Sequence, residues 1–93
     1  MITSQQIQVI KDLTKRFDPT FLGIFGSYAR GSQRSDSDLD ILIDFNKRIN
    51  LLDIISLEDE LSKKLGISVD LVTRRSVNQQ LKPYIEKDLI RLS

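Results

Sequence analysis

Hydrophobic residues recur at helical spacing in two long segments of the chain. The first segment covers residues 3–17, where Thr3 and Gln6 have the spacing of a capping box. Its apolar positions are Ile7, Ile10, Leu13 and Phe17. The second segment begins at Asn50, a good N-cap residue, and ends at Leu65, just before Gly66. Its apolar positions are Ile54, Leu57, Leu61 and Leu65. Both patterns predict amphipathic helices.

Three short apolar runs have the composition of β-strands. They cover residues 21–25, 38–45 and 67–73. In the second run the side chains alternate, so that one face carries Leu39, Ile41, Ile43 and Phe45. The opposite face carries Asp38, Asp40, Leu42 and Asp44. A strand of this kind indicates a sheet with helices on one side and a cleft on the other.

Shorter elements are expected between and after these segments. Ser27 to Gly31 predicts one or two helical turns, and the polar residues 32–37 predict a tight loop. Further on, Ser76 and Gln79 predict a capping box, and Pro83 predicts the opening of a last helix. The apolar face of that helix is expected to hold Ile85, Leu89 and Leu92. The order of elements predicts an α/β or α+β fold with helices packed on one face of a small mixed sheet.

Composition limits the size of the protein and its chemistry. A chain of 93 residues is expected to form a single domain, residues 1–93, with a modest core. The net charge of +1 disfavours stable binding to nucleic acid. Because His and Cys are absent, catalysis must use carboxylates, hydroxyls, Lys, Arg or a bound ion. Neither a signal peptide nor a membrane-spanning run is recognisable, so a soluble, cytoplasmic protein is expected.

Three carboxylates are candidate metal ligands. Asp38 and Asp40 are one residue apart at the start of a predicted strand, and their side chains therefore project from the same face. Taken alone, the pair is equally well explained as solvated acids at a strand edge. Asp70 stands inside an apolar run, where a lone acid is costly to bury unless it is paired or coordinated. If the two strands are neighbours, the three carboxylates converge and require a cation.

A phosphate site is predicted beside these acids. Gly26 and Ser27 stand where a strand turns into a helix, so their N–H groups can hold a phosphate, although a serine N-cap there is also a common structural feature. Arg30 is either a phosphate ligand or an exposed cation. Arg74 and Arg75 follow the third strand closely enough to contact a nucleotide, but surface charge explains them better. The same explanation holds for Arg34, Lys47 and Arg48.

The motif that joins these residues resembles a known family. Phe25-Gly26-Ser27, ten residues, Asp38-Leu39-Asp40-Ile41 and then the lone Asp70 are similar to the nucleotidyltransferase superfamily related to DNA polymerase beta. The fuller string GSYARG followed by SDLD, in so short a chain, resembles the minimal nucleotidyltransferase (MNT) antitoxins of HEPN/MNT toxin and antitoxin pairs. The resemblance covers about half of the chain directly, residues 21–45 and 66–73.

This resemblance implies a fold, a reaction and a partner. The fold would be the core of the polymerase-beta-like nucleotidyltransferases. Asp38, Asp40 and Asp70 would bind one or two Mg²⁺ ions, while Gly26, Ser27 and Arg30 would hold the phosphates of ATP. AMP would pass to a hydroxyl, expected to be that of a tyrosine, on a HEPN ribonuclease toxin. That toxin would thereby be neutralised, and the two proteins would form a hetero-oligomer.

Two other functions are compatible with the same residues. One is an antitoxin without catalysis, which inhibits its HEPN partner by binding alone and keeps the motif as a nucleotide-binding or structural site. The other is an enzyme that nucleotidylates a small molecule, although a chain of 93 residues leaves little room for an acceptor domain.

Overall fold

The computed structural model describes residues 2–93. Four strands form one sheet: β1 (Phe21–Phe25), β2 (Leu39–Asp44), β3 (Val69–Thr73) and β4 (Ile90–Arg91). Four α-helices connect or flank them: α1 (Ser4–Thr14), α2 (Ser27–Arg30), α3 (Leu51–Leu65) and α4 (Lys82–Asp88). Two 3₁₀ turns, η1 (Lys15–Phe17) and η2 (Arg74–Ser76), follow α1 and β3. The predicted α/β class and the mixed sheet are confirmed.

The strand order in the sheet is β3-β2-β1-β4. β1 runs antiparallel to both β2 and β4, whereas β2 and β3 are parallel. The antiparallel register places Phe25 opposite Asp40, and the parallel register places Asp40 opposite Asp70. The strands that carry Asp40 and Asp70 are therefore neighbours, which is the condition stated above for these carboxylates to converge.

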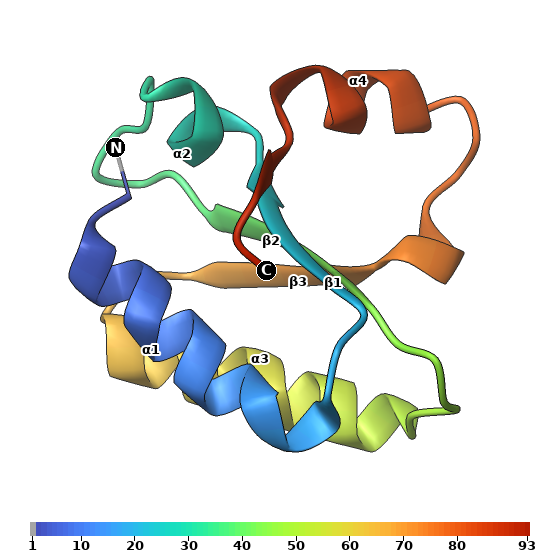
Figure 1. The fold of residues 1–93 in the computed structure, drawn as a ribbon. Helices are drawn as coiled ribbons and strands as arrows, with labels where there is room; N and C mark the ends of the chain where they lie inside the picture. Colours follow the sequence, from blue (N-terminus) through green and yellow to red (C-terminus); the bar gives the residue numbers. More distant parts are fainter. Residues whose placement is uncertain (1) are drawn as a thin grey trace.

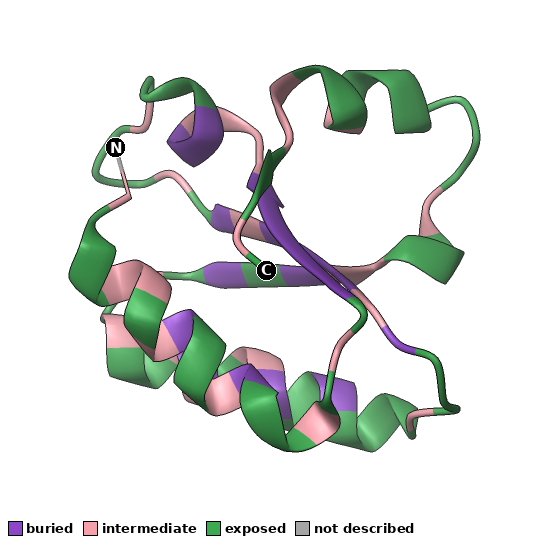
Figure 2. Cartoon of the chain, viewed as in Figure 1, coloured by how far each residue is buried: buried purple, intermediate pink, exposed green. Residues whose placement is uncertain are grey.

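The hydrophobic core lies between the sheet and the two long helices. Figure 1 shows α1 and α3 together on one side of the sheet, and Figure 2 shows that their buried residues face it. On β2, Leu39, Ile41 and Ile43 are fully buried, as the alternation predicted. They pack with Leu57 and Leu61 of α3 and with Ile10 of α1. Burial of each such side chain contributes about 1.5–3 kcal/mol, so this layer fixes the orientation of β2 and sends its alternate residues to the other face.

The two long helices begin as the sequence predicted. Thr3 Oγ1 accepts from the Gln6 backbone N–H at 3.1 Å, and Gln6 Oε1 accepts from the Thr3 N–H at 2.9 Å. Asn50 caps α3 through the Leu52 N–H, and Gly66 ends that helix in a left-handed conformation. The last predicted turn of the first helix, at residues 15–17, is the 3₁₀ turn η1. Two strands are shorter than expected, because Asp38, Phe45, Ile67 and Ser68 lie outside β2 and β3.

The C-terminal third differs from the prediction. Ser76 and Gln79 form no capping box; the Ser76 hydroxyl instead donates to the Thr73 carbonyl at 2.8 Å inside η2. Pro83 does stand in the first turn of a helix, α4, but that helix ends at Asp88. Leu89 and Leu92 are therefore not on its face. Leu92 N–H donates to Leu22 O at 2.7 Å, because the chain turns back and pairs with β1.

A glycine in β1 makes this last pairing sterically feasible. Gly23 lies opposite Arg91, and a Cβ at position 23 would come within 2.9 Å of the Ile90 carbonyl oxygen. The short strand β4 can thus approach β1 closely, because position 23 has no side chain. α4, which precedes β4, lies on the face of the sheet opposite α1 and α3 (Figure 1).

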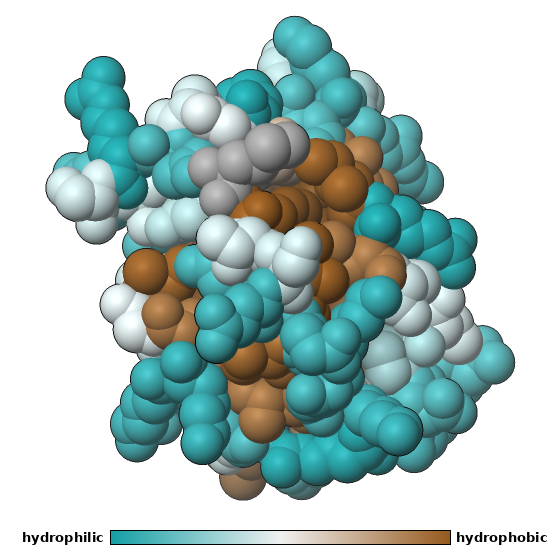
Figure 3. All heavy atoms as spheres, turned by 60° about the vertical axis from the view of Figure 1, so that its left-hand side comes forward, coloured by the Kyte–Doolittle hydropathy of each residue, from teal (hydrophilic) through white to brown (hydrophobic). Residues whose placement is uncertain are grey.

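The surface is mostly hydrophilic, with local hydrophobic areas. Figure 3 shows one in the middle of the face that it presents, surrounded by hydrophilic side chains. A separate exposed group on α3 consists of Leu51, Leu52 and Ile55. None of the helices in residues 2–93 combines the length and hydrophobicity that a transmembrane helix requires.

Candidate active site

A pocket of about 470 Å³ opens on the sheet face that carries α4. Asp40 of β2 and Asp70 of β3 line it from the sheet, and Phe25 and Gly26 line it at the end of β1. This volume is within the range of small-molecule binding sites. The register explains why the two carboxylates meet: partners on adjacent parallel strands point their side chains to the same face.

The environment of Asp40 opposes its ionisation. Burial raises the pKa of Asp40 to about 6, repulsion from Asp70 and then Asp38 adds to the rise, and Arg30 partly opposes it. Asp40 is half-buried, whereas Asp70 is exposed. A site that holds two carboxylates on paired positions of adjacent strands, without enough positive charge to balance them, has the electrostatics of a cation site.

Asp38 occupies a different position from the other two acids. It precedes β2, is exposed and does not line the pocket, although its charge acts on Asp40. Within residues 2–93, no three Asp, Glu, His or Cys side chains lie close enough together to form a metal-binding group. The structure therefore brings Asp40 and Asp70 together and leaves Asp38 outside the pocket, so the meeting of all three carboxylates expected from the sequence is not found in residues 2–93. Two carboxylates suffice for Mg²⁺, which usually takes one or two from the protein and its other ligands from phosphates and water.

Gly26 forms a corner that admits no side chain. Its φ of 74° and ψ of −152° lie outside the regions open to other residues, and a Cβ there would collide with Oδ2 of Asp40. The backbone of Gly26 can therefore lie directly against the carboxylate. Ser27 begins α2, and the first N–H groups of a helix have no acceptor in a preceding turn. The Ser27 side chain is half-buried and does not line the pocket.

Arg30 lines the pocket but is already paired. Its guanidinium donates to Asp88 Oδ2 at 2.9 Å, which links α2 to the end of α4. The Arg30 side chain is half exposed. It can thus exchange Asp88 for another anion without crossing the protein interior.

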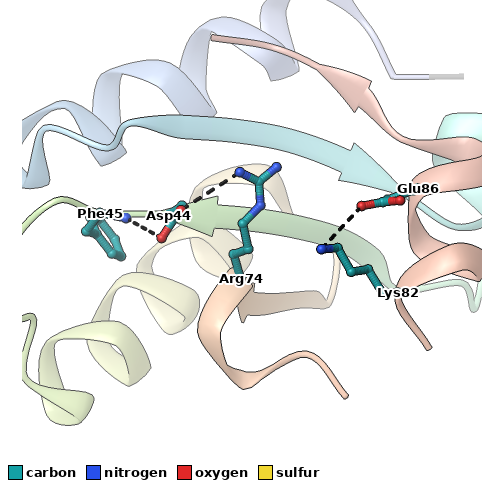
Figure 4. Close-up of polar contacts among 5 residues, drawn as sticks. All are labelled: Asp44, Phe45, Arg74, Lys82 and Glu86. Atoms are coloured by element: carbon teal, nitrogen blue, oxygen red, sulfur yellow. Dashed lines mark hydrogen bonds and ion pairs between the residues drawn. The ribbon is translucent and has the colours of Figure 1, made fainter. Parts of the chain in front are cut away.

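The other arginines considered from the sequence lie elsewhere. Arg74 stacks over the Phe21 ring at 4.3 Å and lies 3.9 Å from Asp44, at the opposite end of β2 from Asp40. Figure 4 shows the contact between Arg74 and Asp44, together with the Lys82 and Glu86 pair on α4. Arg75 lines a different hollow with Lys47 and Arg48. None of these residues, nor Arg34, lines the pocket of Asp40.

Sequence reasoning missed the wall of the pocket that faces the sheet. This wall is formed by the segment after β3, with Leu81, Tyr84, Ile85 and Asp88 from α4 and the residue before it. Their spacing of i, i+3, i+4 and i+7 places them on one helical face and could have revealed it. That pattern was not recognised, because the apolar face of the last helix was assigned to Ile85, Leu89 and Leu92 instead.

With this geometry, comparison with known proteins defines the class of the molecule. The model of the nucleotidyltransferase domain family matches residues 6–92, and the chain belongs to that family. The resemblance found in the motif is confirmed, as is the prediction of a nucleotidyltransferase enzyme.

Its relatives in sequence carry a more specific name. The protein adenylyltransferase MntA of Thermococcus cleftensis is 43% identical over 96 residues, a match that covers 98% of this chain and 93% of MntA. MJ1217 of Methanocaldococcus jannaschii, named as a candidate protein adenylyltransferase, is 49% identical over 81 residues, covering 86% of this chain and 83% of that protein.

Solved structures share the fold. A candidate minimal nucleotidyltransferase has a TM-score of 0.81 at 34% identity, with 92% of this chain and 88% of that chain covered. A toxin-antitoxin complex with AMP-PNP contains a chain with a TM-score of 0.85 at 26% identity, covering 94% of this chain and 72% of that one. The tri-AMPylated HEPN toxin of Shewanella oneidensis in complex with its MNT antitoxin also matches, with a TM-score of 0.81; at 21% identity it supports the fold alone.

Proposed function

We propose that this chain is an antitoxin that transfers AMP from ATP to a hydroxyl of a HEPN toxin, in a reaction that depends on Mg²⁺. The observation that carries the proposal is the register of Asp40 with Asp70 beside the Gly26 corner, in a pocket of nucleotide size. The names of the relatives support adenylyl transfer to protein, and the toxin-antitoxin structures of similar fold support a toxin as acceptor.

Each side of the pocket has a distinct role in this proposal. Asp40 and Asp70 bind Mg²⁺ from the sheet, and Asp38 contributes as a ligand or as negative charge at the rim. When bound, Mg²⁺ supplies the positive charge that neutralises the triphosphate and makes the α-phosphorus a better electrophile. The backbone of Gly26 and Ser27 holds the outer phosphates, and Arg30 leaves Asp88 to bind one of them.

The chemical step is an in-line substitution at phosphorus. The acceptor hydroxyl, that of a tyrosine on the toxin, attacks the α-phosphorus, and the bond from that phosphorus to the pyrophosphate oxygen breaks. Asp70 either completes a second metal position or accepts the proton of this hydroxyl, and its exposure leaves it within reach of an acceptor. Positioning by the rigid ends of β1, β2 and β3 supplies much of the rate.

A macromolecular acceptor can reach the pocket, because Asp70 on its sheet side and Tyr84 on its α4 side are exposed. We propose that residues 1–93 act as one cytoplasmic domain, with the catalytic face open to a docked toxin. Modification of a tyrosine would then silence the toxin within a hetero-oligomer.

Labelling of the toxin by α-labelled ATP tests this function. Incubation with Mg²⁺ and the HEPN toxin proposed as the partner of this chain should label that toxin. Asp40→Asn should abolish the label, while Asp36→Asn, which removes an exposed acid outside the pocket, should leave it unchanged. Equal labelling by the wild type and Asp40→Asn would sink the proposal, and toxin inhibition that persists in Asp40→Asn without labelling would indicate neutralisation by binding alone.

A further inference from the structure

One face of α4 is directed into the pocket and carries unusual side chains for an exposed helix. Leu81, Tyr84 and Ile85 occupy successive positions on this face, and Asp88 completes it one turn later. Val77, directly after η2, lines the pocket as well. Three apolar or aromatic side chains at helical spacing normally face a protein core, but here they face an open pocket.

Packing in the hydrophobic core does not account for the apolar side chains on this face, because they are not buried. Leu81 is 56% exposed and Tyr84 is 74% exposed, and no residue of α4 is buried. Figure 2 shows α4 as the most exposed of the helices that flank the sheet. Since exposed apolar area costs free energy in water, a ligand that covers Leu81 and Tyr84 would gain from their burial.

The pocket has two chemically different ends. Asp88, at the end of α4, contacts Arg30 of α2, beside the Gly26 corner that is proposed to take the phosphates. Leu81 lies seven residues earlier, a rise of about 10 Å along a helix. A ligand that lay along this face would meet charged groups at one end and an apolar, aromatic surface at the other. A nucleotide, with its anionic tail and flat ring, has this polarity.

We infer that the α4 face is the nucleobase-binding wall of the pocket, and that the Tyr84 ring stacks on the base. This inference rests on the proposed nucleotide substrate and adds the residue that distinguishes a nucleotide from a bare polyphosphate. Stacking uses the flat face that every base has, so the wall favours bases in general and purines most, because their larger ring covers more of Leu81 and Tyr84.

The test compares two ligands that differ in the base. Binding of AMP-PNP and of inorganic tripolyphosphate, each with Mg²⁺, is measured by calorimetry on the full chain. Tyr84→Ala should weaken AMP-PNP binding by about 5- to 150-fold and leave tripolyphosphate binding unchanged. Tyr84→Phe, which keeps the ring, should retain AMP-PNP affinity. Ile55→Ala removes an exposed apolar side chain from α3, outside the pocket, and should alter neither ligand.

The outcomes separate this inference from the proposed function. If the wild type binds both ligands and Tyr84→Ala leaves AMP-PNP affinity unchanged, the base-binding wall is wrong and the nucleotidyltransferase site stands. Equal weakening of both ligands by Tyr84→Ala would also overturn the inference, because it would reflect a collapsed pocket. If the wild type binds neither ligand with Mg²⁺, the proposed function fails and the inference fails with it.

Discussion

Asp40 lies directly opposite Asp70 on the adjacent parallel strand, and within residues 2–93 neither carboxylate forms a salt bridge with a basic side chain. Two acids held in this way destabilise the folded protein unless a cation or a proton is bound. The relationship therefore couples stability to pH and to metal, and both couplings can be measured without the toxin.

The first prediction concerns pH. The pKa of Asp40 is raised from 3.8 to about 6, so between these values the folded state binds a proton that the unfolded state does not. The Asp40 contribution to the free energy of unfolding therefore falls as pH rises through this window, and the penalty is complete above pH 6. Asp40→Asn should be more stable than the wild type at pH 8 in the presence of a chelator, by on the order of 1 kcal/mol after allowance for solvent screening.

Urea unfolding of both proteins at pH 4 and pH 8 measures this difference. The advantage of Asp40→Asn should shrink toward zero at pH 4, where the wild-type carboxyl is protonated. A mutant that is less stable than the wild type at pH 8 would contradict the electrostatic account of the site.

The second prediction concerns metal. If Asp40 and Asp70 bind Mg²⁺ as proposed, Mg²⁺ should raise the thermal midpoint of the wild type, because only the folded sheet holds these two carboxylates together. At ten times the dissociation constant the gain is about 1.4 kcal/mol. Asp40→Asn and Asp70→Asn should lose this gain, while Asp36→Asn should keep it. Identical Mg²⁺ shifts in all four proteins would place the ion elsewhere.

The third prediction compares two glycines that share a positive φ but differ in ψ, which is −152° at Gly26 and 20° at Gly31. Gly26 and Gly31 have φ values of 74° and 75°, but a Cβ on Gly26 would strike Asp40 whereas one on Gly31 would meet nothing within 4 Å. Gly31→Ala should cost about 1 kcal/mol, the strain of the left-handed region. Gly26→Ala should cost more and should also weaken Mg²⁺ and tripolyphosphate binding. Equal losses of stability, read from chemical denaturation, would mean that the corner is not closely packed.

The fourth prediction concerns the Arg30 and Asp88 pair. Asp88→Asn removes the anion that competes with phosphate for Arg30, so tripolyphosphate should bind several-fold more tightly. The stability change should stay below about 1 kcal/mol, because Arg30 is half exposed. Glu86→Gln makes the same charge change on α4 but affects a residue that pairs with Lys82 outside the pocket, and it serves as the control. The proposed exchange of Asp88 for phosphate at Arg30 would be refuted if calorimetry gave the same tripolyphosphate affinity for Asp88→Asn and Glu86→Gln.

The sequence was informative where structure is local or strictly periodic. The alternation of β2 predicted that Leu39, Ile41 and Ile43 face the core and that the acids lie on the other face. It did not predict that Leu42, on the acidic face, is buried as well. The caps of α1 and α3 were also recognisable, because each depends on side chains two or three residues from the N–H that they accept from.

The wall of the pocket could not be predicted in the same way. Leu89 and Leu92 suit a helix by spacing, but Leu92 bonds to Leu22, a partner 70 residues away, and this pairing ends α4 at Asp88. A strand of two residues, Ile90–Arg91, has no period to detect. Tertiary pairing therefore overrode local propensity. The predicted helix opened at Pro83 and was extended too far, so the pocket-facing spacing of Leu81, Tyr84, Ile85 and Asp88 was not recognised.

The pocket is assembled from two parts of the chain that meet only in the folded state. The acids come from strands β2 and β3, whereas the opposing wall comes from residues 76–88. Exchange of that C-terminal segment between homologues could thus alter which nucleotide is preferred while the groups assigned to phosphoryl chemistry stay intact. Substrate choice and reactivity would then be able to evolve, or be engineered, independently of each other.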